Sequence, residues 1–158
     1  MKFRGVGVVL VLACALALPA TAGAFTSVPA FRSALQRRIN HFRAEYHLRP
    51  IHLNLRLEHA AQAHSADMAS HHDFSHSGSS GVSWIARIRY WGYHGDWIGE
   101  NLAVGGNVTA KTVMAMWKAS PPHRANLLRS AFAAVGIGAS PGTYSGRAAV
   151  YITSDFGG

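Results

Sequence analysis

The strongest constraint on the fold is a change of hydrophobic pattern along the chain. In its first part, apolar residues recur at three- and four-residue steps, which is typical of amphipathic helices. Near its end, two apolar segments, "AAVGIGA" and "AAVYITSDF", flank a turn that contains Pro141 and Gly142, which is typical of a hairpin. Helices followed by strands favour an α+β layered domain over a βαβ array.

Apolar spacing and capping residues predict four helices before this hairpin. The first passes through Phe31 and Phe42, and the second follows Asn54, whose side chain suits an N-cap. A third, shorter helix ends at Gly92. Thr109 can cap the fourth, and the dipeptide Pro-Pro stops it.

Residues 1–24 have the pattern of a secretory signal peptide. Lys2 and Arg4 precede an apolar run, and a small-residue cleavage site ends at Ala24. The uncharged run is short for spanning a bilayer. We therefore expect a secreted or periplasmic domain of residues 25–158 with no transmembrane segment after cleavage.

Cys14 is the only cysteine of the chain. The sequence "VLAC" around it loosely resembles a lipoprotein processing site, so a lipid-anchored form is an alternative. Cleavage after residue 24 would leave no disulfide, and stability would depend on the core. Loss of Lys2 and Arg4 would lower the formal charge from +8 to +6. That charge suits acidic envelope polymers or lipid headgroups. No basic cluster alternates with aromatic residues, so we expect no nucleic-acid partner.

The segment "WIGENLAVGG" contains one carboxylate, Glu100, among apolar residues and glycines, although the 158 residues include only seven acids. A buried carboxylate requires a partner, because an unpaired buried charge is costly. We interpret the segment as a glycine-bounded loop. His76, which opens a glycine-serine loop, and His123, which follows two prolines, are the candidate partners.

Two imidazoles and a carboxylate allow two kinds of chemistry. With neutral imidazoles, His76 and His123 could ligate a divalent metal such as zinc and leave a position open for water. Without a metal, the same three side chains could do acid–base work, with Glu100 as the candidate catalytic residue. Spacings of 24 and 23 residues mean that only the fold could bring them together.

The ordered motifs "FSH", "GENLA", "SPPHRANLL", "VGIG" and "YITSDFG" resemble the bacterial branch of the CAP superfamily. This superfamily comprises cysteine-rich secretory proteins, antigen 5 and pathogenesis-related 1 proteins, which share the SCP domain. The resemblance covers about residues 31–158. It implies a three-layer α-β-α sandwich with a small antiparallel sheet. It also implies a cavity lined by His76, Glu100 and His123, which binds a divalent metal in some members.

One position departs from the family pattern that the resemblance implies. A second cavity acid is expected shortly after a helix tryptophan, but Ser120 stands there. We expect the Ser120 hydroxyl to line the cavity in place of that acid. A hydroxyl is a poor ligand beside a carboxylate, so the site offers three protein ligands instead of four.

Three functions of different classes fit these observations. The first is a binding module for a cell-envelope, lipid-like or other small ligand, with or without a divalent metal. The second is a metal-dependent hydrolase or protease that uses the same cavity. The third is a secreted protein-interaction module in which the cavity is purely structural. We favour the first, because charge and aromatic content suit it.

Overall fold

The computed structural model describes residues 27–158 of the chain. The predicted signal peptide, residues 1–24, and Cys14 lie outside the described residues. The boundary at residue 25 and the lipid-anchored alternative therefore stay predictions. No helix within residues 27–158 has the length and apolar character needed to cross a bilayer.

Five helices and four strands form the described part of the chain. In chain order they are α1 (Val28–Ala44), β1 (His52–Leu53), α2 (Leu55–His71), α3 (Trp84–Tyr90), β2 (Ile98–Gly105), α4 (Ala110–Ala119), α5 (Pro121–Leu127), β3 (Ala134–Tyr144) and β4 (Arg147–Gly157). The predicted caps are confirmed. The Asn54 side chain accepts hydrogen bonds from two backbone amides of α2, and Thr109 forms a capping box at the start of α4. Pro121 ends α4 as predicted and also begins α5.

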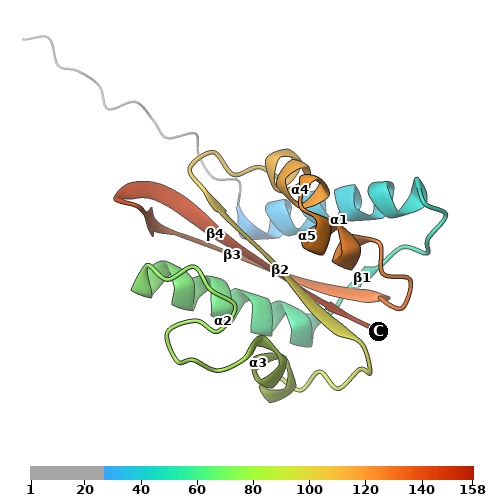
Figure 1. The fold of residues 1–158 in the computed structure, drawn as a ribbon, viewed down its shortest axis with the longest axis horizontal. Helices are drawn as coiled ribbons and strands as arrows, with labels where there is room; N and C mark the ends of the chain where they lie inside the picture. Colours follow the sequence, from blue (N-terminus) through green and yellow to red (C-terminus); the bar gives the residue numbers. More distant parts are fainter. Residues whose placement is uncertain (1–26) are drawn as a thin grey trace, which may run out of the picture.

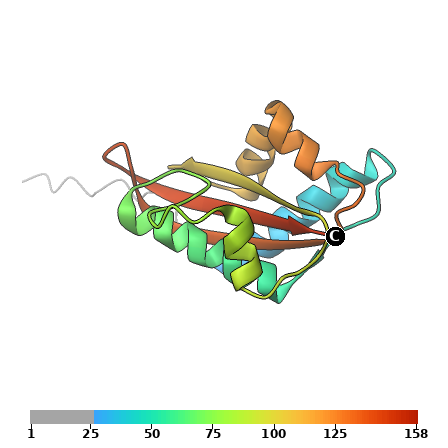
Figure 2. The same cartoon turned by 60° about the horizontal axis from the view of Figure 1, so that its bottom comes forward.

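The elements form three layers (Figure 1). Helices α2 and α3 lie on one face of the sheet, and α1, α4 and α5 cover the other, as the turned view also shows (Figure 2). The strand order is β1-β3-β4-β2. The three long strands are antiparallel, and the short β1 pairs with β3 in parallel, so the sheet is mixed. The predicted α+β, α-β-α architecture is confirmed.

The interpretation of the Glu100 segment as a loop is wrong. Residues Ile98–Gly105 form β2, which pairs with β4 along its whole length at the edge of the sheet. Five consecutive residues of this strand, from Gly99 to Ala103, are buried. Because both faces of the strand are covered, it lacks the alternation of polar and apolar residues that marks a half-exposed strand.

Two glycines of β3 allow α2 to lie directly on the sheet. A Cβ atom at Gly136 would stand 2.0 Å from the backbone of Leu57, and one at Gly138 would stand 2.2 Å from the carbonyl oxygen of Ala61. Any side chain at either position would therefore push the helix away. This contact fixes the height of α2 over β3 and β4.

A buried arginine fixes the position of α5 on the other face of the sheet. The guanidinium group of Arg43, 1% exposed, donates hydrogen bonds to the carbonyl oxygens of Arg49, Leu127, Arg129 and Phe132. These carbonyls belong to the segment after α1, the end of α5 and the segment that leads to β3. The end of α5 is thereby tied to α1.

We predict that Gly138→Ala lowers the free energy of unfolding by about 1–3 kcal/mol, the usual cost of overpacking. The added methyl group would overlap the backbone of Ala61, which cannot rotate away. Chemical denaturation of both variants would measure the change. The matched control is Gly105→Ala, whose Cβ would meet only Val108 at an ordinary 3.7 Å. Equal stability of the two variants would contradict the proposed contact.

Candidate functional site

Glu100 is buried in the edge strand β2 and makes contacts through both of its carboxylate oxygens. Its side chain is 1% exposed. Oε1 accepts a hydrogen bond from Nδ1 of His76 at 2.6 Å, and Oε2 accepts one from Nη2 of Arg87. The predicted contact between Glu100 and His76 is therefore present. With its side chain enclosed, Glu100 can act on a solvent-borne molecule only through the groups that surround it.

Arg87, on α3, is the cation that balances this buried carboxylate. Its side chain is 11% exposed. Besides Glu100 it contacts the backbone carbonyl of His76, to which Nη1 donates at 3.3 Å. Arg87 thus holds both the carboxylate and the loop residue that the carboxylate binds. An ion pair that loses one buried partner leaves an uncompensated charge, which makes this contact important for the local structure.

His64, on α2, supports the loop that carries His76. Its Nε2 atom lies 2.9 Å from the carbonyl oxygen of Ser75. Because a carbonyl can only accept, Nε2 carries the proton in this contact. Burial, followed by repulsion from Arg87, lowers the pKa of His64, so the ring is neutral near pH 7. Nε2 also lies 4.0 Å from Oε2 of Glu100.

The rest of this loop is tied to α2 by Asp67. Its carboxylate accepts hydrogen bonds from the backbone amide of Ser79 at 2.8 Å and from the Ser79 hydroxyl at 2.5 Å. Gly78, the residue before Ser79, has a φ of +66°, and a Cβ there would lie 2.4 Å from Asp67. The glycine in "SHSGSSG" therefore has a specific role, since it lets the loop close over α2.

The electrostatic setting differs between the two predicted histidines. The hydrogen bond to Glu100 raises the pKa of His76, whose side chain is 55% exposed. Burial, with repulsion from His76 as a second cause, lowers the pKa of His123. His76 therefore keeps its proton to a higher pH than His123 does. Between their two pKa values, such a pair provides one proton donor and one acceptor.

Two asparagine side chains hold His123 close to the strand that carries Glu100. Asn101 donates to the carbonyl oxygen of His123 at 3.0 Å. Asn126, in turn, donates to the carbonyl oxygen of Glu100 at 3.0 Å and to Oδ1 of Asn101 at 2.9 Å. The motifs "GEN" and "HRAN" therefore connect β2 to α5 through amide hydrogen bonds. Asn101 has the structural role its residue type favours.

Ser120 lies between α4 and α5, where it is the C-cap residue of one helix and the N-cap residue of the next. Its side chain makes no capping hydrogen bond at the start of α5. Its backbone carbonyl accepts from the amide of Arg124 at 2.9 Å. No contact within the described residues links its hydroxyl to Glu100, and its place in a ligand cavity stays a prediction.

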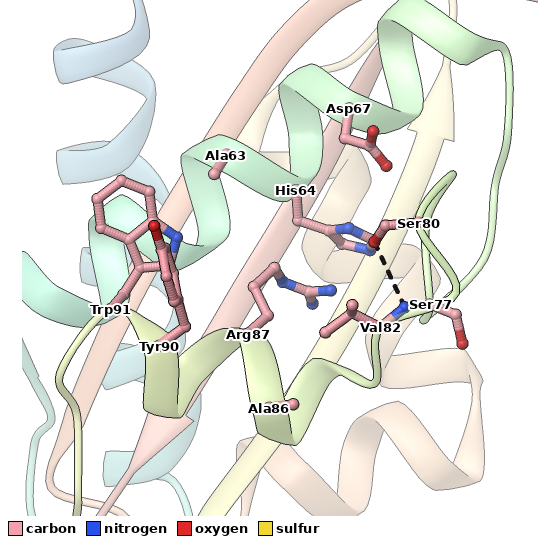
Figure 3. Close-up of a pocket in the computed structure, with 10 residues that line it drawn as sticks. All are labelled: Ala63, His64, Asp67, Ser77, Ser80, Val82, Ala86, Arg87, Tyr90 and Trp91. Atoms are coloured by element: carbon pink, nitrogen blue, oxygen red, sulfur yellow. Dashed lines mark hydrogen bonds between the residues drawn. The ribbon is translucent and has the colours of Figure 1, made fainter.

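A pocket of about 490 Å³ opens between α2, α3 and the loop that joins them. Figure 3 shows His64 and Arg87 facing each other across its middle, with Tyr90 and Trp91 at one end and the loop serines at the other. Its lining residues are Ala63, His64, Asp67, Ser77, Ser80, Val82, Ala86, Arg87, Tyr90 and Trp91. His64 and Arg87 are thus shared between this pocket and the Glu100 cluster.

The donor atoms around Glu100 do not by themselves form a divalent-metal site. Both Glu100 oxygens already accept hydrogen bonds, one of them from a guanidinium cation. This leaves the imidazoles of His76 and His123, whereas catalytic zinc sites use three protein ligands. Within residues 27–158, no group of three or more His, Cys, Asp or Glu side chains is arranged to hold a metal. Metal binding therefore stays a prediction, and no chemical step is derived from it.

The fold and the site together define a class of protein: a three-layer α-β-α domain with a histidine–glutamate pair at the edge strand of its sheet. The model of the cysteine-rich secretory protein family, CAP, matches residues 36–156. The chain therefore belongs to this family. It is 31% identical over 127 residues to the uncharacterized protein YkwD of Bacillus subtilis (strain 168). This match covers 76% of this chain and 49% of YkwD. The chain thus spans about half the length of that relative.

Solved structures of bacterial proteins show the same fold. An extracellular protein containing a SCP domain from Bacillus anthracis has a TM-score of 0.69 at 23% identity, covering 81% of this chain and 40% of that protein. An outer surface protein from Borrelia burgdorferi has a TM-score of 0.66 at 18% identity, and the match covers 79% of this chain and 90% of that protein. A cysteine-rich secretory protein from Staphylococcus aureus has a TM-score of 0.62 at 19% identity, and the match covers 81% of this chain and 38% of that protein.

Sequence reasoning missed two residues of the cluster, and only one had a visible signal. His64 lies on the same apolar face of α2 as Leu57 and Met68, and this position indicates burial but no role in a site. Arg87 had no distinguishing signal, because arginines also occur two residues away at Arg89 and elsewhere on exposed surfaces. The need of Glu100 for a partner pointed to a cation without identifying which one.

We predict that Glu100→Gln lowers the pKa of His76, because the charge-assisted hydrogen bond that raises it is lost. The pair stabilises the fold fully below the unfolded pKa of histidine, about 6.5, and the gain disappears as pH rises through the raised folded value. The variant should therefore lose stability at every pH, because Arg87 loses its buried partner, and should lose more on the acidic side of this window, where the contact with His76 also contributes. Histidine titration by NMR, with denaturation at several pH values, would measure both effects.

The matched control is Glu45→Gln, which removes an exposed carboxylate at the end of α1 that lies 3.5 Å from His41. This control should leave the His76 titration unchanged. An unchanged His76 titration in Glu100→Gln would contradict the pairing of His76 with Glu100.

Proposed function

We propose that this protein is an extracytoplasmic binding module for a small amphipathic ligand, either lipid-like or derived from the cell envelope. The ligand would occupy the pocket between α2 and α3. The observation that carries the proposal is the composition of this pocket. Apolar side chains form its walls, and two nitrogen-bearing side chains that also surround Glu100 lie in its middle.

The size and walls of the pocket support a small organic ligand. Its volume of about 490 Å³ lies within the range of small-molecule sites, roughly 300–1,000 Å³. Tyr90 is 85% exposed, Val82 44% and Trp91 37%. Adjacent exposed apolar side chains around a hollow are typical of binding surfaces. Tryptophan and tyrosine rings would cover the apolar part of a ligand.

The polar part of a ligand would meet the groups that hold Glu100. Arg87 and His64 both line the pocket, and both lie next to the Glu100 carboxylate. A ligand that attracts Arg87 would therefore compete with Glu100 for its guanidinium group. Binding in the pocket should therefore change the pKa of His76, because the Glu100 carboxylate also accepts a hydrogen bond from that histidine.

Two observations support a location outside the cytoplasm. Relatives of the same fold are described as an extracellular protein and an outer surface protein. The net positive charge of the chain suits a surface rich in acidic polymers or lipid headgroups. Localisation of a tagged protein in cell fractions, with and without residues 1–24, would test this part of the proposal.

We predict that Ala86→Phe, which fills the pocket from α3, abolishes ligand binding without loss of stability. The residue is exposed and lines the pocket, so a phenyl ring can enter the hollow without displacing the core. Native mass spectrometry and thermal shift with a panel of anionic lipids, fatty acids and cell-wall fragments would measure binding. The matched control, Ala115→Phe, adds the same ring at an exposed alanine of α4 and should bind normally. Normal binding by Ala86→Phe would place the ligand elsewhere.

Zinc binding tests the metal-dependent alternative. If His76 and His123 take up zinc, affinity should be modest and should rise with pH, because a ligand imidazole must be neutral and the pKa of His76 is raised. Calorimetry on metal-stripped protein would measure this uptake. His76→Ala and His123→Ala should abolish it, whereas His94→Ala, at an exposed position, should not. No uptake by the unaltered protein would exclude the hydrolase that uses this cavity.

A further inference from the structure

Asp155 is a carboxyl group that the site described above does not use. It lies on β4, where its backbone pairs with Glu100 of β2 on one side and Gly136 of β3 on the other. Paired residues of adjacent antiparallel strands point to the same face, with Cβ atoms about 5 Å apart. Asp155 and Glu100 therefore lie side by side beneath α2 and α3. Asp155 is 0% exposed.

Neither carboxyl oxygen of Asp155 accepts a hydrogen bond from any group of residues 27–158. Each packed element explains why. From β3, Gly136 presents no side chain. From α3, Arg87 directs Nη2 to Glu100 and Nη1 to the His76 carbonyl, and its buried Nε has no hydrogen-bond partner within residues 27–158, Asp155 included. From α2, His64 is directed to the Ser75 carbonyl, and Glu58 is paired with Arg32 at 2.6 Å. Asp155 is thus a fully buried polar side chain that has no hydrogen-bond partner within residues 27–158 and lies next to the site.

An ionised Asp155 would be strongly disfavoured in this position. A buried carboxylate without donors loses its hydration and gains nothing in return. A second carboxylate directly beside Glu100 adds repulsion, so two such neighbours do not both ionise readily. Burial, and then repulsion from Glu100, raises the pKa of Asp155 well above its ordinary range, while Arg87 opposes this only in part.

Protonation changes the hydrogen-bonding capacity of Asp155. A carboxylate can only accept, and no donor reaches it, whereas a carboxylic acid has one O–H group to donate. The neighbouring Glu100 carboxylate is an acceptor on the same face. We propose that Asp155 is the second acid of this site, held as a neutral carboxylic acid that donates its proton in a hydrogen bond to Glu100.

Asp155 is then a positioning residue. It gives Glu100 a donor from β4 in addition to His76 from the loop and Arg87 from α3, so the carboxylate is oriented from three elements. Its neutrality also sets the local charge. Arg87 then faces a single carboxylate, and protonation of His76 makes the cluster beside the pocket positive. The second acid thus lies on the sheet, next to Glu100, and not at Ser120 after α4.

Infrared spectroscopy of the full-length protein labelled with 13C-aspartate tests this assignment without any substitution. A neutral buried carboxylic acid gives a C=O stretching band that is isotope-shifted by the label and present at pH 7. We expect this band in the unaltered protein and its loss in Asp155→Asn. Absence of any labelled acid band at pH 7 would overturn the proposal.

Stability gives a second test with a definite sign. Asp155 must stay protonated in the folded state while it ionises in the unfolded state above its ordinary pKa of about 3.9. Its contribution is therefore fully present below that value and is lost as pH rises toward the raised folded value. Asp155→Asn, which keeps the shape and a donor for Glu100, should melt at a higher temperature than the unaltered protein at pH 7. The difference should vanish near pH 4.

A third measurement separates positioning from simple packing. Because Asp155 is neutral, Asp155→Asn should leave the NMR titration of His76 unchanged, whereas Asp155→Leu, which has no donor, should alter it through Glu100. Asp96→Asn, at an exposed position, is the control and should change neither stability nor titration. An ionised Asp155 paired with Arg87 predicts the reverse: Asp155→Asn would melt lower at pH 7 and lower the pKa of His76.

Discussion

The direct contact between α2 and the backbone of β3 is the constraint on which the site depends. Because Gly136 and Gly138 have no side chains, the helix approaches the sheet to within backbone contact. The same helix presents His64 to the carbonyl of Ser75 and Asp67 to the amide of Ser79, and so fixes the loop that carries His76. It also covers β4 and keeps water from the carboxyl groups beneath it. Sheet packing and site geometry therefore have one cause.

Local patterns predicted the layered fold, but they missed α5, β1 and β2 and placed the hairpin turn at Pro141 and Gly142, which belong to β3, instead of at Ser145 and Gly146. The error at β2 has a physical reason. Helices α1, α2 and α4 have clear apolar faces, and α2 and α4 also have recognisable caps. The β3–β4 hairpin has an apolar run on each side of a turn. Strand β2 lacked such a signal, because helices cover both of its faces and its two ends are rich in glycine. Its pairing with β4 is a long-range contact, which no local window of sequence contains.

The sequence predicted only those residues of the site that lie in recognisable motifs. Glu100 and His76 were paired through a family resemblance, and their contact is present at 2.6 Å. The groups that make the pair possible, Arg87 and His64, lie on two different helices and carry no motif. Asp155 was visible as the lone acid of an apolar strand, but its role follows from register, which places it opposite Glu100. Burial and register, not residue type, give these three side chains their roles.

The charges of this cluster also explain how a CAP domain can keep Glu100 buried without the second helix acid that the family pattern leads one to expect. Two acids and two histidines would create a negative site that suits a divalent cation. By the family resemblance, Ser120 stands where one acid is expected, and the guanidinium of Arg87 lies against Glu100. A metal ion would have to displace Arg87 from Glu100 to use that carboxylate, and a displaced buried guanidinium would need a new partner. The cluster is therefore better suited to respond to an anionic group in the adjoining pocket, which could offer Arg87 that partner, than to coordinate a cation through Glu100.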